Sequence, residues 1–350
     1  MKTTLFVKAA SVVALLLLSS TVNAKSWRIH NDTKYHPHFT DINAAMSSAE
    51  VQAGDTLYLD PGCTLLSEQN ITKAVTIIGN GYFLQNGMVP ATIQNKVWIK
   101  ATNTKLVGVT IISQALLYKA ENVTFERCKI LGYISVYAGY GTRYGLTVQQ
   151  CYLNNTETVI GGHGGNALRN ATIKNNIIIQ SSTSSKCYAI ENVHDSEISN
   201  NYIISYKSAY NVLSNITNSK IYNNIISNGT TPNYVFGNSD SGSNNTFHHN
   251  VVSATEGTFT NATDIVWLGT ADFSAVFAEG ANDAAFRLKE GSPAKGAAAD
   301  GGDCGPYGGA TPYVEGGKPL YHPFINDITV SAKPVNGKIK LNLNAKMQNE

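Results

Sequence analysis

The residues best suited to hold a ligand lie in one aromatic and basic segment, Tyr137-Ala-Gly-Tyr140-Gly-Thr-Arg143-Tyr144. Aromatic rings present flat apolar faces to sugar rings, and an Arg guanidinium pairs with a carboxylate or sulfate through two hydrogen bonds. Lys186, in a nearby loop, would add positive charge. We therefore expect these five residues to bind a polysaccharide, with an acidic one favoured. The alternative is a tyrosine-rich loop that packs over the body of the protein.

Carboxylates that could act as catalytic pairs are sparse. Glycoside hydrolysis usually requires two carboxylates ~5–9.5 Å apart, and Glu126 and Glu197 are expected to lie three coils apart in the repeat described below. Asp195 is close to Glu197 in the chain, but Lys220 is the expected partner of Glu197. A calcium-dependent lyase needs several carboxylate oxygens around one ion. Because the body of the chain carries few acids, we expect neither a metal nor a cofactor.

One histidine, His163, lies in a glycine-rich segment that could belong to a catalytic motif. The segment Gly161-Gly-His163-Gly-Gly165 resembles the glycine-histidine-glycine motif of polygalacturonase-type hydrolases. The aspartates that those enzymes carry just upstream are missing, because the chain here reads Asn154-Asn-Thr-Glu157. His163 therefore has two open interpretations, a catalytic residue and an incidental histidine in a glycine-rich turn. A metal-free lyase that neutralises a uronate with Arg143 and takes a proton with His, Lys or Tyr also stays open.

The strongest organising signal is internal repetition. Six segments end in a shared position, and these ends step along the chain by 23, 25, 25, 23 and 26 residues: Cys128, Cys151, Asn176, Asn201, Asn224 and Asn250. Three residues before each end the chain is always apolar: Phe125, Val148, Ile173, Ile198, Ile221 and Phe247. A second apolar column follows two residues after each end: Ile130, Leu153, Ile178, Ile203, Ile226 and Val252.

This period predicts an all-β solenoid, a right-handed parallel β-helix with three short strands in each coil. Stacked coils place equivalent residues ~4.8 Å apart, so the Asn column should form a hydrogen-bonded ladder. Cys128 and Cys151 continue that column. Two buried free thiols are favoured there, and a strained disulfide is the alternative.

Both ends of such a solenoid need covers. At the front, Thr40 is expected to cap a helix whose apolar face includes Ile42, Ala45 and Met46. The sequence Gly-Asp-Thr-Leu-Tyr-Leu-Asp-Pro-Gly at 54–62 then supplies the first strand and turn. This order of helix, first strand and coils resembles the N-terminal part of exported β-helix proteins of the pectate-lyase-like superfamily.

The closing segments at 286–296 and 303–309 resemble the end of bacterial members of the same superfamily. The resemblance implies a parallel β-helix from an exported bacterial protein. It implies no single activity, because that superfamily contains lyases, hydrolases, epimerases and non-catalytic surface proteins. Beyond the closing segments, two alternating runs around Asn336-Gly337 predict a β-hairpin.

The first residues predict export. Lys2 and Lys8, an apolar run from Ala9 to Leu18 and the small residues around Ala24 form a signal peptide, and no later segment approaches the ~20 apolar residues of a spanning helix. We therefore expect a secreted, periplasmic or cell-surface protein. Only 14% of the 350 residues are charged, which argues against a nucleic-acid partner. The expected parts are a signal peptide (1–24), a cap with the first coil (25–62), the β-helix (63–310) and a tail with the hairpin (311–350).

Two functions remain open. In the first, a secreted β-helix protein binds a glycan or a cell-envelope partner on its coil surface without catalysis, which the missing acidic pair favours. In the second, a polysaccharide lyase or hydrolase acts on an acidic polysaccharide, with Arg143 and His163 as its candidate catalytic residues.

Overall fold

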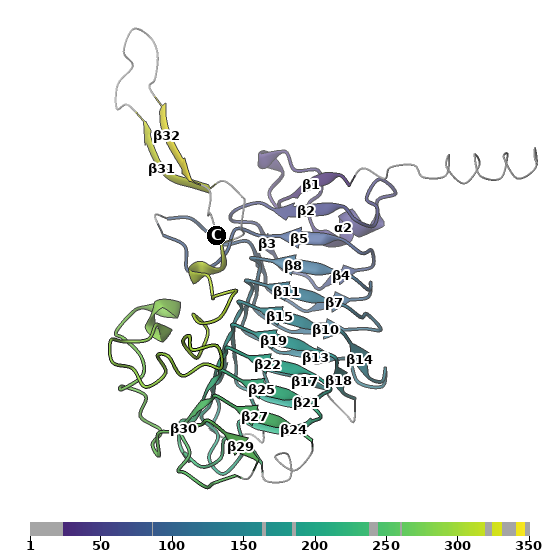
Figure 1. The fold of residues 1–350 in the computed structure, drawn as a ribbon. Helices are drawn as coiled ribbons and strands as arrows, with labels where there is room; N and C mark the ends of the chain where they lie inside the picture. Colours follow the sequence, from purple (N-terminus) through teal and green to yellow (C-terminus); the bar gives the residue numbers. More distant parts are fainter. Residues whose placement is uncertain are drawn as a thin grey trace, which may run out of the picture.

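The chain is a parallel β-helix, as expected (Figure 1). The computed structural model describes residues 24–85, 87–162, 166–183, 187–237, 244–259, 261–318, 324–330 and 341–346. Three parallel sheets run along the solenoid, and each coil adds at most one strand to sheets A and B. Sheet C is less regular, because some coils add two short strands to it.

The strands are short, as the repeat predicts. Sheet A consists of β1 (Ser26–Ile29), β2 (Thr56–Leu59), β5 (Thr76–Ile78), β8 (Lys105–Val107), β11 (Thr124–Glu126), β15 (Thr147–Gln149), β19 (Thr172–Lys174), β22 (Glu197–Ser199), β25 (Lys220–Tyr222), β27 (Thr246–His248) and β29 (Ala262–Thr263). Sheet B consists of β3 (Thr64–Leu65), β6 (Thr92–Ile93), β9 (Thr110–Ile111), β12 (Lys129–Ile130), β16 (Tyr152–Asn155), β20 (Ile177–Gln180), β23 (Tyr202–Ser205), β26 (Ile225–Asn228), β28 (Val251–Val252) and β30 (Val266–Trp267). Sheet C consists of β4 (Gln69–Ile71), β7 (Val97–Ile99), β10 (Ala115–Leu117), β13 (Ile134–Val136), β14 (Arg143–Tyr144), β17 (Ile160–Gly162), β18 (Leu168–Arg169), β21 (Ile190–His194) and β24 (Leu213–Thr217).

The predicted apolar columns form the core. Phe125 pairs with Val148, and the same register continues through Ile173, Ile198, Ile221 and Phe247 in sheet A. The second column, from Ile130 to Val252, follows sheet B in the same way. Both columns are buried, so each coil contributes the same side chains to one continuous core.

The Asn ladder is confirmed. Asn176 Nδ2 donates to Asn201 Oδ1 at 2.9 Å, and Asn201 and Asn224 repeat this bond toward the next coil. The residue before each ladder Asn turns the chain from sheet A to sheet B in the left-handed region, for example Asn200 with φ 52°. Asn tolerates that conformation, which explains the paired asparagines. Cys128 and Cys151 continue the ladder as buried free thiols.

The N-terminal cover is helix α2 (Ile42–Ser47), which packs against β4 and buries Ile42, Ala45 and Met46. Its N-cap is Asp41 and not Thr40, because the Asp41 side chain accepts a hydrogen bond from Ala44 N at 2.7 Å. The expected helix is therefore confirmed, but its start was predicted one residue too early. A short 3-10 helix, η1 (Thr33–Tyr35), precedes it.

The C-terminal end departs from the expected boundary at residue 310. The last strand of the three sheets is β30, and residues 269–318, which we call the strap, turn back along the solenoid (Figure 1). The strap is Gly- and Ala-rich and contains two short 3-10 helices, η2 (Asn282–Phe286) and η3 (Glu315–Gly317). It lacks the Val/Ile-rich runs between Asn turns that build the coils, so it covers a sheet instead of extending one.

The strap packs on the outer face of sheet B. Outward side chains of that sheet, among them Ile177, Tyr202 and Ile225, form a second apolar cluster with Phe273 and Val276 of the strap. Its backbone is also pinned to the turns between sheets A and B: Arg127 donates to Lys318 O, Gln150 to Pro312 O, Asn175 to Gly308 O, and Asn223 accepts from Ala299 N. The strap therefore covers the outer face of sheet B.

The tail contains the predicted hairpin. Strands β31 (Phe324–Val330) and β32 (Leu341–Lys346) pair antiparallel, while the predicted Asn336-Gly337 turn lies outside the described residues. Most of the predicted signal peptide also lies outside them. Within the described part of the chain, no helix is long and apolar enough to cross a membrane.

Candidate functional site

An aromatic cluster lies on the outer side of sheet C. It consists of Trp98, Tyr118, Tyr137 and Tyr140. The rings of Trp98 and Tyr137 are 4.8 Å apart, those of Tyr118 and Tyr140 are 4.3 Å apart, and Tyr137 stacks on Tyr140 at 5.6 Å. Tyr137 keeps 38% of its surface exposed. Trp98 stands nearly perpendicular to Tyr137, at 72°, while Tyr137 and Tyr140 are closer to parallel, at 28°. The cluster therefore offers the neighbouring rings of Tyr137 and Tyr140 to a ligand.

The register of the coils creates this cluster. Ile99, Leu117 and Val136 are paired in sheet C, so the residues that follow them, Lys100, Tyr118 and Tyr137, leave the sheet at equivalent places. The hydrogen bonds from Tyr118 N to Ile99 O and from Tyr137 N to Leu117 O hold that alignment. Trp98 and Tyr118 were missed in the sequence. Their signal is the spacing of Lys100, Tyr118 and Tyr137, which are 18 and 19 residues apart, a shorter period than in the later coils.

Positive charge flanks the rings. Lys100 Nζ lies 5.4 Å from the centre of the Tyr118 ring, and Lys119 Nζ lies 5.4 Å from that of Tyr140. Both lysines are exposed. Trp98 Nε1 donates to Glu68 at 2.9 Å, which orients the indole. The hydrogen bond from Tyr118 raises the pKa of Tyr140, so the Tyr140 phenol is neutral near pH 7. The charged groups around the rings are Lys100, Lys119 and Glu68.

Arg143 lies beneath this surface. Along β14 and β18 it pairs with Leu168, and the same column continues inward with Val193 and Ile216. Only 13% of its side chain is exposed. The guanidinium donates to the Tyr140 carbonyl and lies 3.9 Å from Glu121. Arg143 thus holds the loop that carries Tyr140, because strand alternation directs it inward.

The other predicted site residues are dispersed. Tyr144 follows Arg143 on β14, is 42% exposed and pairs with Arg169, so it faces outward. The structure brings Tyr137 and Tyr140 together and places Arg143 under them. Lys186 and His163 lie outside the described residues, so their roles stay predictions.

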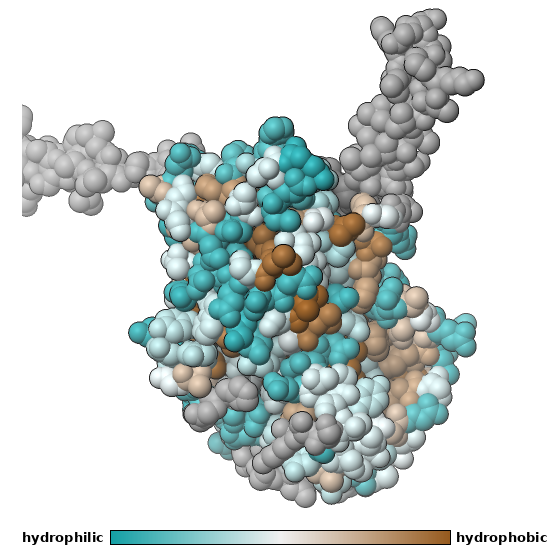
Figure 2. All heavy atoms as spheres, turned by 180° about the vertical axis from the view of Figure 1, so that it is seen from behind, coloured by the Kyte–Doolittle hydropathy of each residue, from teal (hydrophilic) through white to brown (hydrophobic). Residues whose placement is uncertain are grey.

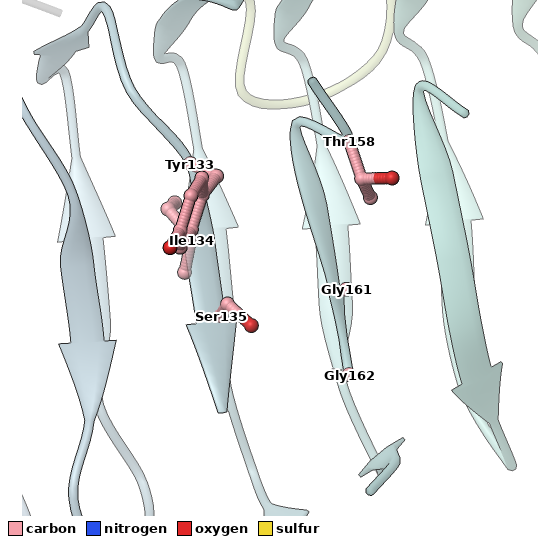
Figure 3. A pocket seen from close by; sticks show the side chains of 6 residues that line it. All are labelled: Tyr133, Ile134, Ser135, Thr158, Gly161 and Gly162. Carbon is pink, nitrogen blue, oxygen red and sulfur yellow. The ribbon is translucent and has the colours of Figure 1, made fainter. Parts of the chain in front are cut away.

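A small hollow adjoins the cluster on the same sheet (Figure 3). It has a volume of about 10 Å³, room for roughly one water molecule, and is lined by Tyr133, Ile134, Ser135, Thr158, Gly161 and Gly162. Drug-sized ligands usually occupy pockets of roughly 300–1,000 Å³, so this hollow does not hold a sugar ring. Figure 3 shows the Ser135 hydroxyl directed toward the strand that carries Gly161 and Gly162.

A second group of polar side chains lies on the outer face of sheet A. Tyr222 OH donates to Glu197 Oε1 at 2.6 Å, and the Tyr222 ring stacks on His248 at 5.3 Å and 7°. Burial and then Glu197 raise the pKa of Tyr222, whereas burial and then His249 lower that of His248. Lys174 and Lys220 occupy neighbouring register positions. The group therefore combines a neutral imidazole, a protonated phenol, the Glu197 carboxyl group and two cations.

Metal binding finds little support in these faces. Across the described ranges, no group of three or more His, Cys, Asp and Glu side chains is arranged to hold an ion. His248 and His249 face each other at 3.0 Å between their Nδ1 atoms. Figure 2, the view from behind, shows a mostly hydrophilic surface. Paler brown atoms gather at its right, where the strap of Figure 1 lies after the 180° turn.

Comparisons with known proteins give a distant structural likeness. No family model matches the sequence, and no curated protein matches it. Three chains of solved structures match. One of them, the crystal structure of pectate lyase Pel9A, is 13% identical with a TM-score of 0.48, over 82% of this chain and 98% of that chain. A likeness this distant does not indicate an activity.

Proposed function

We propose that the protein binds an acidic glycan on the aromatic cluster of sheet C. The observation that carries the proposal is the set of four clustered rings with exposed lysines at their edge. Sugar rings stack their apolar faces on aromatic side chains, and Lys100 and Lys119 would attract the acidic group. Arg143 acts through Tyr140, because its guanidinium holds that loop.

Binding and its site are tested together by titration calorimetry with a polyuronate, a sulfated glycan and a neutral glycan. Tyr137→Ala removes an exposed ring and should weaken binding of the acidic ligand at least tenfold. Tyr234→Ala is the matched control, because Tyr234 is similarly exposed, at 42%, and lies in a later coil. The two acidic probes distinguish a carboxylate from a sulfate ligand. Equal loss in both variants, or no binding by the wild type, would refute the proposal.

A second candidate function is cleavage of an acidic polysaccharide by a metal-free lyase, favoured by the Tyr222, Glu197 and His248 group on sheet A. His248 would take the proton next to the uronate carboxylate. The electron pair left behind forms the C=C bond as the C–O bond to the leaving sugar breaks, and Tyr222 protonates that oxygen. Lys174 or Lys220 would neutralise the carboxylate.

The absorbance of unsaturated uronate products separates this candidate from binding alone. A lyase at sheet A should lose at least a hundredfold in rate with Tyr222→Phe, whereas Tyr137→Ala, on the outer side of sheet C, should leave that rate unchanged. Reducing ends that rise without this absorbance would indicate a hydrolase and bring His163 back as a candidate. No product with either assay would leave the binding function alone.

We also propose that the chain is exported from a bacterial cell, with cleavage after Ala24. The tripartite N-terminus supports export, and the resemblance of both caps supports a bacterial origin. Expression in a host with a secretory pathway and N-terminal mass spectrometry of the exported product would test the cleavage. A product that keeps Met1 and stays in the cytoplasm would refute it.

A further inference from the structure

Two adjacent imidazoles meet at the outer edge of sheet A. His248 is the last residue of β27, and its side chain points outward in the column that holds Tyr222 one coil earlier. His249 follows in the turn to sheet B with a φ of 51°. Neighbouring side chains within a strand point to opposite faces, but this left-handed residue lies beyond the strand. The turn therefore brings both rings to one side, with 3.0 Å between their Nδ1 atoms.

Each ring is held in place by a further contact. The Tyr222 ring stacks on His248 at 5.3 Å and 7°. His249 Nε2 lies 3.9 Å from Asp264 Oδ2, so the carboxylate favours a proton on Nε2 and leaves the lone pair on Nδ1. The backbone N–H of His249 also donates to Thr263 O at 3.1 Å. The two Nδ1 atoms are thus positioned before any ligand arrives.

The distance between the two nitrogens selects a coordination geometry. Imidazole nitrogens bind zinc at about 2.0–2.1 Å, and a similar bond length holds for the neighbouring first-row metals. Two such bonds at a right angle place the nitrogens about 2.8–3.0 Å apart, whereas a tetrahedral angle places them about 3.3–3.4 Å apart. The observed 3.0 Å fits the right angle. Square-planar or tetragonal geometry is typical of Cu²⁺ and Ni²⁺, and Zn²⁺ prefers the tetrahedral arrangement.

Charges of both signs lie near the pair. Asp264, whose side chain is 66% exposed, faces His249 from the next coil. Lys220 lies one coil back, where it pairs with Thr246 at the start of β27. Within the described part of the chain, no group of three or more His, Cys, Asp and Glu side chains could hold an ion. A metal at this edge therefore has two protein ligands and completes its coordination with water.

We propose that His248 and His249 form a binding site for a Cu²⁺ ion, held through both Nδ1 atoms in adjacent positions of a tetragonal complex. Without the ion these nitrogens share a proton in a hydrogen bond. The ion takes the place of that proton, and both rings then carry theirs on Nε2. Cu²⁺ is preferred to Ni²⁺ and Zn²⁺, because it stands highest in the affinity order of these ions. The site lies on sheet A and is independent of the glycan binding proposed for sheet C.

Titration of the full chain with Cu²⁺, after purification without a histidine tag, tests the site by calorimetry and electron paramagnetic resonance. One equivalent should bind and give a tetragonal spectrum with splitting from two nitrogens. His248→Gln and His249→Gln should each weaken binding at least tenfold, and Asp264→Asn severalfold, because a carboxylate behind a ligand imidazole strengthens it. His36→Gln is the matched control, since His36 is another histidine at the surface, and it should leave the affinity unchanged.

The spectrum of the wild type decides the matter even if a variant does not fold. No copper binding, splitting from a single nitrogen, or binding that survives both substitutions together would overturn the site. An equal loss with His36→Gln and His249→Gln would also overturn it. Zn²⁺ bound as tightly as Cu²⁺ would contradict the right-angled geometry. Tyr137→Ala should not affect copper binding, so the copper site and the glycan-binding function fail separately.

Discussion

At the scale of single residues, the asparagine ladder couples each coil to the next. Asn224 Oδ1 accepts hydrogen bonds from the backbone and side-chain nitrogens of Asn201, and its own Nδ2 donates to Ile198 O at 2.8 Å. All these groups are buried. A ladder side chain therefore satisfies polar atoms in the coils on both sides of it, which the hydrophobic core cannot do.

Asn224→Ala should lower the free energy of unfolding by about 3 kcal/mol or more, because each buried polar group left without a partner costs about 1–3 kcal/mol. Urea denaturation followed by circular dichroism measures the change. Gln94→Ala is the control, since Gln94 is an exposed amide between β6 and β7, and it should change stability by less than about 0.5 kcal/mol. Similar losses in the two variants would mean that the ladder contributes no special stability.

Residue types alone predicted two members of the aromatic cluster. Tyr137 and Tyr140 were found because two tyrosines near an arginine suggest a sugar-binding surface, and the structure clusters their rings. Arg143 was predicted to meet the ligand, but strand alternation turns it inward, and a strand of two residues is too short for its register to be predicted from the residue pattern. Trp98 was overlooked because its coil lacks the Asn or Cys that marks the later ones.

At the scale of elements, the coils were predictable and the strap was not. A repeat of 23 to 26 residues with two apolar columns allows one arrangement of short parallel strands, and the register follows it. The strap has no period, and its contacts are made with residues far away in the chain, such as Tyr313 with Tyr82. Local patterns therefore could not reveal which sheet it covers.

The strap is fastened at its end by a buried carboxylate. Asp283 Oδ2 accepts hydrogen bonds from Tyr313 OH at 3.0 Å and from Gly316 N at 2.6 Å, and Tyr313 OH meets Tyr82 OH at 2.6 Å. Burial raises the pKa of Asp283 in spite of these bonds. The folded protein thus holds the Asp283 proton more tightly than the unfolded chain does.

Because of this proton linkage, the stability that the strap contributes to the fold depends on pH. The pKa of Asp283 is higher in the folded protein than in the unfolded chain. The protonated Asp283 side chain therefore contributes its full stabilisation below the ordinary Asp pKa of about 3.9, and this stabilisation is lost as the pH rises through the pKa of the folded protein. Asp283→Asn keeps an acceptor oxygen but does not titrate. Denaturation of both proteins at several pH values should show the wild type losing stability relative to Asp283→Asn as the pH rises. A constant difference at every pH would contradict this account.

At the scale of the whole molecule, the solenoid body carries a positive bias. Between Gln69 and Thr255 there are 13 Lys and Arg residues against 7 Asp and Glu. Such a field could attract an acidic polymer to any face, whereas the proposed site requires the lysines beside the aromatic rings. The two contributions differ in range, because exposed charges are screened beyond ~8 Å at physiological salt.

The salt dependence of binding distinguishes the positive charge of the whole solenoid body from the contribution of the lysines beside the rings. Added salt should weaken binding of a long oligogalacturonate to the wild type, since exposed cations contribute. Replacing Lys100 and Lys119 together with Gln should weaken binding and flatten the salt dependence, because these side chains lie at the rings. Replacing Lys174 and Lys220 on sheet A with Gln removes the same net charge. This second double variant should keep most of the affinity and most of its salt dependence. If the two double variants behave alike, the glycan responds to the charge of the whole body, and the lysines beside the rings have no particular role.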